Sequence, residues 1–436
     1  MTPAYCSAVS APSRRVVVVG ASLAGLRAAE VLRDNGFDGE LTLIGDEPDE
    51  PYDRPPLSKA VLSGWLTTDQ IWLPQSRDLD ARWLLGTRAA GLDVPRREVL
   101  LADGRRIGFD RMLMATGTRA RPWPQQVENS LTGVHVLRGR DDAHRLRAEL
   151  AAGPRRVLVI GGGFIGCEVA SSCKELGLSV TLIQRSGAPL ISAVGSVVGG
   201  FVAEQMREAG VDLRLHTTAT RLEGDQSGRL CRATLSDGHV LEVDVAVVAL
   251  GSIRNIEWLD GAGLAADHRG VVCDAACRVF DAEGVITDDL FAAGDIARWP
   301  HPLYTGELIS IEHWSNAVDQ AAIAAHNMLC SPAARRAHQS LPAFWSDQFG
   351  LNIKSIGLPN LADQVVIAQG TLDARCFVAA YGRHGRLVGA VAINSPRVLD
   401  GYASLIEART SFPPVLNAPD GPPQPHVVEA GFPEYS

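Results

Sequence analysis

The chain has 436 residues, of which 46% are hydrophobic and 21% are charged, and its formal net charge at pH 7 is −9. This length allows about two or three domains with their own cores, and the acidic balance argues against a general nucleic-acid-binding protein. The sequence shows no continuous apolar run long enough for a membrane span and no signal-like N-terminus, so we expect a cytoplasmic protein without a membrane partner.

The first predicted unit lies near the N-terminus. Residues 15–19 (RVVVV) are typical of a buried parallel strand, residues 26–35 have a helical pattern, and residues 40–44 (ELTLI) predict a second strand. A turn with two glycines, 20–25 (GASLAG), separates the first strand from the helix. Such a turn lets a pyrophosphate approach backbone N–H groups at the positive end of a helix, and an acid after the second strand can bind a ribose. We therefore predict a dinucleotide site that contains Gly20, Ser22, Ala24, Gly25 and Asp46.

Ser22 departs from the usual pattern, which has a second glycine at this position. A serine fits there if its φ is negative, and its hydroxyl could then bond a phosphate. The order Gly20-x-Ser22-x-Ala24 also resembles the nucleophile elbow of an α/β-hydrolase. That elbow normally follows several strands and leaves Asp46 without a role, so the pattern favours the dinucleotide site.

The next segments connect this unit to the middle of the chain. Residues 51–59 (PYDRPPLSK) form a stiff proline-rich loop, and a helix is expected after it. Residues 97–107 contain an Asp-Gly turn signal and predict a hairpin. The apolar run 112–115 predicts a further strand.

A second dinucleotide unit follows, and its motif is complete. Residues 156–160 predict a strand, 161–166 (GGGFIG) match the G-x-G-x-x-G turn, and a helix and a strand at 179–183 come after it. An acid normally follows that strand and binds the ribose 2′-hydroxyl. This chain has Gln184 and Arg185 instead, which favours NADPH over NADH, although an arginine here can also simply face solvent.

The last third of the chain contains two kinds of strand. The apolar runs 243–250 and 290–293 each end at a glycine, and Asp295 after the second either caps a helix or binds a ligand hydroxyl. From about residue 327 the pattern changes to the alternation of antiparallel strands, at residues 364–368, 376–381 and 387–392.

Several separate motifs together resemble the FAD-dependent ferredoxin reductases of bacterial oxygenase and cytochrome P450 systems. They are residues 51–59, 115–117, 161–170, 293–295, 311–316 and 344–348. The resemblance implies an α/β chain with two Rossmann-like dinucleotide-binding domains of glutathione-reductase-like architecture and a C-terminal α+β interface domain. The implied ranges are 14–118 and 248–326 for the FAD-binding domain, 119–247 for the NAD(P)H-binding domain, 327–410 for the C-terminal domain and 411–436 for a tail.

The resemblance also implies roles for single residues. Lys59 would lie near the reactive flavin ring and pair with Glu168, and Trp345 would help to cover the nicotinamide pocket. Together with the two turns, the implied FAD-binding residues are Gly20, Ser22, Ala24, Gly25, Asp46, Arg54, Lys59, Ala89, Arg138, Asp295 and Trp314. The corresponding residues for NADH or NADPH are Gly161, Gly163, Ile165, Gly166, Gln184, Arg185 and Gly251.

The implied activity is hydride transfer from NADH or NADPH to FAD, followed by single-electron transfer to an iron–sulfur ferredoxin that serves a P450 or Rieske-type oxygenase. No cysteine lies between Cys6 and Cys167, which argues against the disulfide mechanism of related flavoproteins. Cys273 and Cys277 are expected to be buried side chains, not a redox or metal centre. No metal site is indicated, and we expect a monomer or a weak dimer.

Two alternative functions stay open. One is a reductase of the same fold that acts on a small acceptor such as a quinone, rubredoxin or monodehydroascorbate. The other is a flavin-bound signalling or scaffold protein whose redox state governs partner binding. Because ferredoxins are usually acidic, a basic docking patch is expected, with candidates at Arg335, Arg336, Arg383 and Arg386.

Overall fold

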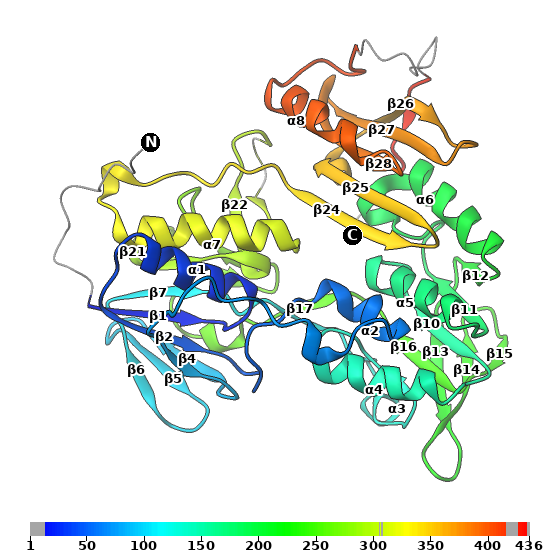
Figure 1. The fold of residues 1–436 in the computed structure, drawn as a ribbon, viewed down its shortest axis with the longest axis horizontal. Coiled ribbons are helices and arrows are strands. Elements are labelled where there is room, and N and C mark those ends of the chain that lie inside the picture. The colour runs from blue at the N-terminus through cyan, green and yellow to red at the C-terminus, as the bar shows by residue number, and fades with distance from the viewer. Residues whose placement is uncertain (1–13, 305, 307, 416–425, 434–436) are drawn as a thin grey trace. The chain divides into compact units, whose positions relative to one another are not determined.

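The computed structural model describes residues 14–304, 306, 308–415 and 426–433 (Figure 1). Parts of the predicted tail, residues 416–425 and 434–436, therefore lie outside the described residues. The chain packs as two compact units, and each is assembled from segments that are distant in the sequence. Of the described residues, the first unit comprises those in 14–53, 72–119 and 253–342, and the second comprises those in 54–71, 120–252 and 343–433.

The first unit is built on a six-stranded sheet with the order β20-β21-β7-β1-β2-β3. All neighbouring pairs are parallel except β20 with β21, so five strands have their carboxyl ends at one edge. The strands are β1 (Arg15–Val19), β2 (Glu40–Ile44), β3 (Arg82–Leu84), β7 (Arg111–Met114), β20 (Arg278–Phe280) and β21 (Ile286–Ala292).

Two long helices of this unit, α1 (Leu23–Asp34) and α7 (Trp314–Leu329), lie side by side over the sheet (Figure 1). Their small side chains make the close approach possible, because Ala28, Ala29, Ala321 and Ala324 are all fully buried. This core holds the carboxyl ends of the strands in a fixed position. The site of the first unit is therefore built on a rigid base.

Short strands, most of them in antiparallel pairs, complete the first unit. The hairpin predicted at 97–107 is confirmed, since β5 and β6 pair in antiparallel fashion. These strands are β4 (Ala89–Asp93), β5 (Glu98–Leu101), β6 (Arg106–Gly108), β18 (Ala266–Asp267), β19 (Gly270–Val272), β22 (Ala297–Pro300) and β23 (Leu308–Ile309), and the short 3-10 helices are η3 (Glu257–Leu259), η4 (Gly294–Ile296) and η5 (Pro332–Ala334). Two of the points at which the chain passes from one unit to the other lie within β8 (Thr118–Ala120) and β17 (Ser252–Arg254).

The second unit contains an entirely parallel sheet with the order β12-β11-β10-β16-β9. Its strands are β9 (Val134–His135), β10 (Val157–Ile160), β11 (Val180–Gln184), β12 (Asp212–Leu215) and β16 (Val245–Val248). The helices of this part are α2 (Ala60–Ser63), α3 (Gln126–Asn129), α4 (Arg140–Ala151), α5 (Phe164–Glu175) and α6 (Ile191–Glu208), with the 3-10 turns η1 (Pro55–Ser58) and η2 (Thr68–Gln70). A separate antiparallel sheet consists of β13 (Ala219–Gly224), β14 (Leu230–Leu235) and β15 (Val240–Glu242).

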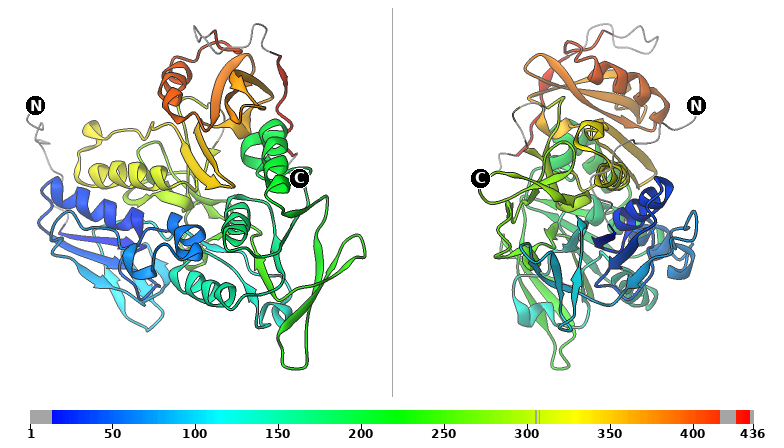
Figure 2. Two further views of the ribbon diagram at one scale, coloured as in Figure 1. Left: turned by 45° about the vertical axis from the view of Figure 1, so that its right-hand side comes forward. Right: turned by 90° about the vertical axis from the view of Figure 1, so that its left-hand side faces the viewer.

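The C-terminal part of the second unit is an antiparallel six-stranded sheet with the order β24-β25-β28-β27-β26-β29, next to the helix α8 (Leu399–Glu407) (Figure 2). Its strands are β24 (Ala343–Gln348), β25 (Leu351–Gly357), β26 (Gln364–Thr371), β27 (Cys376–Arg383), β28 (Arg386–Ile393) and β29 (Val428–Glu429), with the 3-10 helices η6 (Pro359–Leu361) and η7 (Pro396–Val398). The predicted α/β class, with two dinucleotide-type sheets and an α+β C-terminal part, is confirmed.

Candidate active site

The first glycine-containing turn is shaped by backbone packing. Gly20 has a φ of +120°, and a Cβ at this residue would lie 2.0 Å from the carbonyl oxygen of Ala115. A Cβ on Gly25 would lie 1.9 Å from the carbonyl oxygen of Gly20. Because real Cβ atoms do not approach an oxygen so closely, only glycine allows α1 to begin directly against the end of β1.

The second turn repeats this geometry. Gly161 has a φ of +108°, and its Cβ would lie 2.3 Å from the carbonyl oxygen of Ala249. A Cβ on Gly166 would lie 1.9 Å from the carbonyl oxygen of Gly161. The two turns therefore place α1 and α5 in the same way against their first strands.

Both helices begin without a side-chain cap. Ser22 precedes α1 with a φ of −108°, as the sequence required, and Gly163 precedes α5 with a φ of −77°. Neither helix has an acidic residue in its first turn. The N–H groups at both N-termini are thus open to an anion, and the residues present fit the pyrophosphate of a dinucleotide.

Two acids lie at the edge where the parallel strands of the first unit end. Asp46 follows β2 and is exposed, and Asp295 lies in η4 just after β21. The hydroxyl of Thr118 donates to Asp295 Oδ2 at 3.1 Å. A Cβ on Gly294 would lie 3.6 Å from Cβ of Ala24, so the backbone next to Asp295 packs near the start of α1. Both carboxylates are therefore placed where α/β folds bind ligands.

The other predicted residues of the first unit lie around the same edge. Trp314 begins α7, is 37% exposed, and donates from Nε1 to Asp53 Oδ1 at 2.9 Å. Ala89 is buried at the start of β4, and the N–H of Thr87 just before it donates to the carbonyl of Gly45 at 2.7 Å. The entry to β4 is thus fixed beside the loop that carries Asp46.

In the second unit, the buried carboxylate of Glu168 is contacted by three donor side chains. Glu168 on α5 is 4% exposed. Lys59 Nζ lies 2.7 Å from its Oε2, Ser58 donates to the same oxygen at 2.5 Å, and Ser346 donates to Oε1 at 2.6 Å. The predicted pairing of Lys59 with Glu168 is confirmed. A buried carboxylate needs such partners, and together they fix the position of the lysine ammonium.

Arg54 and Arg138 also come together in the second unit. Arg54 Nη1 donates to the carbonyl of Arg138 at 3.0 Å. The N–H of Arg138 in turn donates to Asp142 Oδ2 at 3.1 Å, at the start of α4. Residues 54–59 of the proline-rich loop, which belong to the second unit, are therefore held within it by the contact of Arg54 as well as by that of Lys59.

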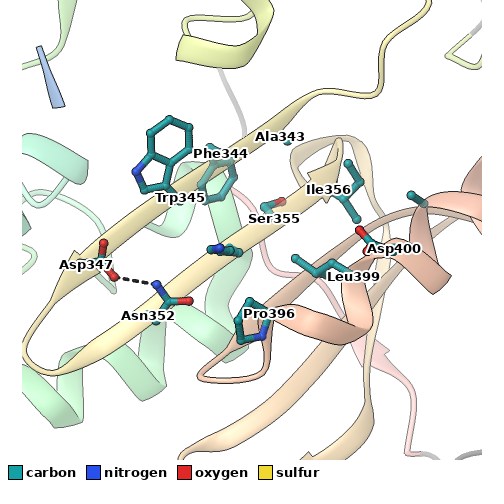
Figure 3. Close-up of a pocket in the computed structure, with 12 residues that line it drawn as sticks. Ala343, Phe344, Trp345, Asp347, Asn352, Ser355, Ile356, Pro396, Leu399 and Asp400 are labelled. Carbon is teal, nitrogen blue, oxygen red and sulfur yellow. Dashed lines mark hydrogen bonds between the residues drawn. The ribbon is translucent and has the colours of Figure 1, made fainter. Parts of the chain in front are cut away.

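Trp345 lies on β24, where alternate side chains point to opposite faces. Phe344 packs against Phe164 of α5 with ring centroids 4.8 Å apart, and Ser346 reaches Glu168 on the same helix. Trp345 lies between them in sequence, is 39% exposed and borders a cavity of about 470 Å³ between β24, β25 and α8 (Figure 3).

The position that normally carries the ribose-binding acid differs in the second unit. Gln184 Oε1 accepts the N–H of Gly162 at 2.9 Å, so the side chain is held against the turn. Arg185 is exposed. Gly251 follows β16 with a φ of +87° and open space at its Cβ, and Ile165 in the first turn of α5 is 38% exposed. These residues border the same carboxyl edge of the sheet.

The cysteines do not form a redox centre within the described residues. All seven of them are free, and Cys273 and Cys277 are fully buried, as predicted. Burial raises the pKa of the Cys173 thiol to about 12 and that of Cys277 well above its usual value. Such thiols are protonated and inert at neutral pH. The described residues also contain no group of three or more His, Cys, Asp or Glu side chains suited to a metal ion.

Sequence reasoning missed Ser58 and Ser346 as partners of Glu168. They lie 110 and 178 residues from it along the chain, so no local pattern joins them. The available signal was their position, because each is adjacent to a predicted site residue, Lys59 or Trp345. The bond from Trp314 to Asp53 was missed for the same reason.

Comparison with known proteins places the chain in a family. Residues 14–321 match the pyridine nucleotide-disulphide oxidoreductase family, and residues 343–421 match the reductase C-terminal family. Rhodocoxin reductase of Rhodococcus erythropolis is 35% identical over 88% of this chain and 87% of its own. Putidaredoxin reductase of Pseudomonas putida is 33% identical over 97% of this chain and 98% of its own.

Solved structures agree with this result. The putidaredoxin reductase in its covalent complex with putidaredoxin has a TM-score of 0.83 at 31% identity, covering 90% of this chain and 93% of that chain. The resemblance inferred from separate motifs is thereby confirmed over nearly the whole length. The chain belongs to the pyridine nucleotide-disulphide oxidoreductase family, among the FAD- and NAD(P)H-dependent ferredoxin reductases that carry the reductase C-terminal domain.

Proposed function

We propose that the protein oxidises NADH or NADPH with bound FAD and passes single electrons to a small iron–sulfur ferredoxin that serves a P450 or Rieske-type oxygenase. The observation that carries this proposal is the presence of two dinucleotide-type turns with uncapped helix N-termini and no reactive cysteine pair in the described chain. When bound, FAD supplies a redox group that can take up two electrons together from the nicotinamide donor and release them one at a time.

The chain's own residues would bind and orient the FAD and the nicotinamide donor. In the proposed arrangement the first turn, Asp46 and Asp295 hold the FAD, and the second turn holds NADH or NADPH. Glu168 fixes the position of the Lys59 side chain, whose Nζ lies 2.7 Å from its Oε2. Trp345 would help to exclude water from the nicotinamide.

We propose the following functions for the parts of the chain. Residues 14–118 and 248–326 bind FAD, residues 119–247 bind the nicotinamide donor, and residues 327–410 form the interface domain. The placement of the turns at Gly20 and Gly161 supports it. We also propose a cytoplasmic location, supported by the free state of the described cysteines. Within the described ranges, no helix has both the length and the apolar character needed to cross a membrane.

For the partner surface, the turn at Arg383 and Arg386 is the better of the basic candidates. Arg335 Nη1 is bound to Asp288 at 2.7 Å and its side chain is only 7% exposed, so it presents little charge to a partner. Arg383 and Arg386 end β27 and begin β28 at a tight hairpin. Rim charges of this kind would speed association with an acidic ferredoxin.

The direct test is steady-state reduction of a purified [2Fe–2S] ferredoxin by the holoenzyme with NADH or NADPH, next to rates with a quinone, rubredoxin and monodehydroascorbate. Ferredoxin is expected to be the best acceptor by kcat/KM. A higher kcat/KM with one of the small acceptors would show that the protein is instead a reductase of that small acceptor. Slow turnover with every acceptor, together with a long-lived charge-transfer complex, would point to the signalling or scaffold role.

A further inference from the structure

The carboxyl end of β11 carries hydrogen-bond donors where a carboxylate is expected. The Oε1 atom of Gln184 is already used by the N–H of Gly162 at 2.9 Å, so its amide NH2 group is the part left to meet a ligand. Arg185 and Ser186 follow, and among the described residues their side chains make no hydrogen bond or ion pair. The ribose position of the second unit is thus neutral to positive.

A second loop adds to this edge. The N–H of Thr217 donates to the carbonyl of Gln184 at 3.0 Å, and the N–H of His216 lies 3.4 Å from the carbonyl of Ser186. A Cβ on Gly187 would lie 3.3 Å from His216 Cε1, so the imidazole packs against the backbone that carries Arg185. His216 is exposed and has a φ of +52°, which is uncommon for a residue other than glycine.

No carboxylate opposes these groups within the two segments. Asp212 is the only acidic residue in 180–190 and 212–220. Its Oδ2 atom already accepts from Arg214 Nε at 3.0 Å and from Thr181 Oγ1 at 3.2 Å. A dianionic group would therefore meet donors at this edge without a repelling charge of the same sign.

We infer that Gln184, Arg185, Ser186 and His216 form a binding site for the 2′-phosphate of NADPH, and that the protein prefers NADPH to NADH. This inference rests on the proposed function, since it names the donor that the second turn binds. Arg185 supplies the fixed charge, for which a planar guanidinium suits a phosphate well. Gln184 contributes by being uncharged, because an acid at its position would repel the phosphate.

The test measures binding to the oxidised holoenzyme by isothermal titration calorimetry. The probes are adenosine 2′,5′-bisphosphate and 5′-AMP, which differ only in the 2′-phosphate. The wild-type protein is expected to bind the bisphosphate about tenfold or more tightly than AMP. Arg185→Ala and Gln184→Glu should each remove most of that difference, and His216→Ala should reduce it by about threefold.

Arg207→Ala is the matched control, because Arg207 is also exposed, is also unpaired among the described residues, and lies in α6 of the same unit. It should leave the ratio of the two dissociation constants unchanged. Equal binding of the two probes by the wild-type protein would overturn the inference. So would an Arg185→Ala variant that behaves like Arg207→Ala.

The kcat/KM values for NADPH and NADH with ferricyanide provide a second readout and should change in parallel with binding. Failure of the inference and failure of the proposed function can be told apart. A protein that prefers the bisphosphate and NADPH but does not reduce any ferredoxin keeps this site and loses the proposed acceptor. A protein that reduces ferredoxin but prefers NADH keeps the proposed acceptor and loses the 2′-phosphate site.

Discussion

The two dinucleotide-type turns are nearly the same in their backbone and different in their chemistry. In each, the first glycine has a positive φ, and the last would place a Cβ 1.9 Å from a carbonyl oxygen. After the second strand, however, the first unit has the exposed Asp46 and the second has Gln184 bound to its own turn. The glycines fix the shape of both sites, whereas the residues after the second strands decide what each site prefers.

A second difference lies on the helices. Two residues after the last glycine, α1 carries Arg27 and α5 carries Glu168. The side chain of Arg27 is 40% exposed, and its Nη1 lies 3.5 Å from Oε2 of the buried Glu30. Glu168 is buried and receives three hydrogen bonds or ion contacts. The same helix position thus carries a single long ion pair in one unit and the centre of a polar network in the other.

The largest expected effect comes from filling the space that the glycines leave. Gly25→Ala and Gly166→Ala should each lower the free energy of unfolding by about 3 kcal/mol, since the helix must move away from its strand. Urea unfolding followed by circular dichroism measures this. Gly163→Ala is the control, because its Cβ meets open space, and it should change stability by less than about 0.5 kcal/mol. Equal stability of the Gly166 and Gly163 variants would show that close packing is not the reason for the glycine.

Glu168→Gln should have the next largest effect. It leaves the ammonium of Lys59 without its carboxylate, and we expect a loss of about 2 kcal/mol, moderated because Lys59 is 24% exposed. Flavin reduction by NADPH in stopped flow should also slow. At the equivalent position of α1, Arg27→Gln should cost less, about 1 kcal/mol, because the contact with Glu30 is long and the buried Glu30 keeps the N–H of Ser76 as a donor. If the two variants lose similar amounts of unfolding free energy, the contact of Glu168 contributes no more to stability than that of Arg27.

Asp46→Ala should weaken FAD binding by about tenfold, because a carboxylate that accepts from the ribose hydroxyls is lost. Fluorescence titration of the apoprotein with FAD gives the dissociation constant. Asp38→Ala removes the same charge from an exposed residue before β2 and should leave the constant unchanged. If the two variants bind FAD alike, Asp46 does not hold the cofactor.

The smallest effect is expected at the partner surface. The double variant Arg383→Glu, Arg386→Glu should slow ferredoxin reduction at low ionic strength by about threefold through a lower association rate, and leave the reduction of a small dye as in the wild type. As a control, Arg207→Glu reverses one charge elsewhere on the second unit, where the double variant reverses two. Unchanged ferredoxin rates in the double variant, or the same slowing with Arg207→Glu, would show that the hairpin turn is not the dock.

Local patterns predicted the two glycine-containing turns and their flanking strands well, because strand and turn are encoded by neighbouring residues. The β-branched run at 15–19 became β1 with the predicted bounds, and the second strand at 40–44 became β2. The first helix begins at Leu23, earlier than predicted, because the glycine in its first turn hid the helical pattern. Here packing against the strand outweighs the poor helix propensity of glycine.

The site could be predicted only where one residue of a contact had a recognisable motif. Lys59 and Glu168 were paired through the family resemblance, whereas Ser58 and Ser346 were not, because hydrogen bonds across 110 and 178 residues leave no periodic signal. The bond from the Gly162 N–H to Gln184 was hidden for a different reason. The sequence shows that the acid is missing but not how its replacement is used.

The most direct measurement is the absorbance spectrum of the purified protein before and after anaerobic addition of NADPH. We predict a yellow protein that contains one FAD per chain. NADPH should reduce this flavin and remove its yellow absorbance, at a higher rate than NADH does. A colourless protein that does not take up FAD, or a flavin that neither nucleotide reduces, would contradict the assignment of the two turns.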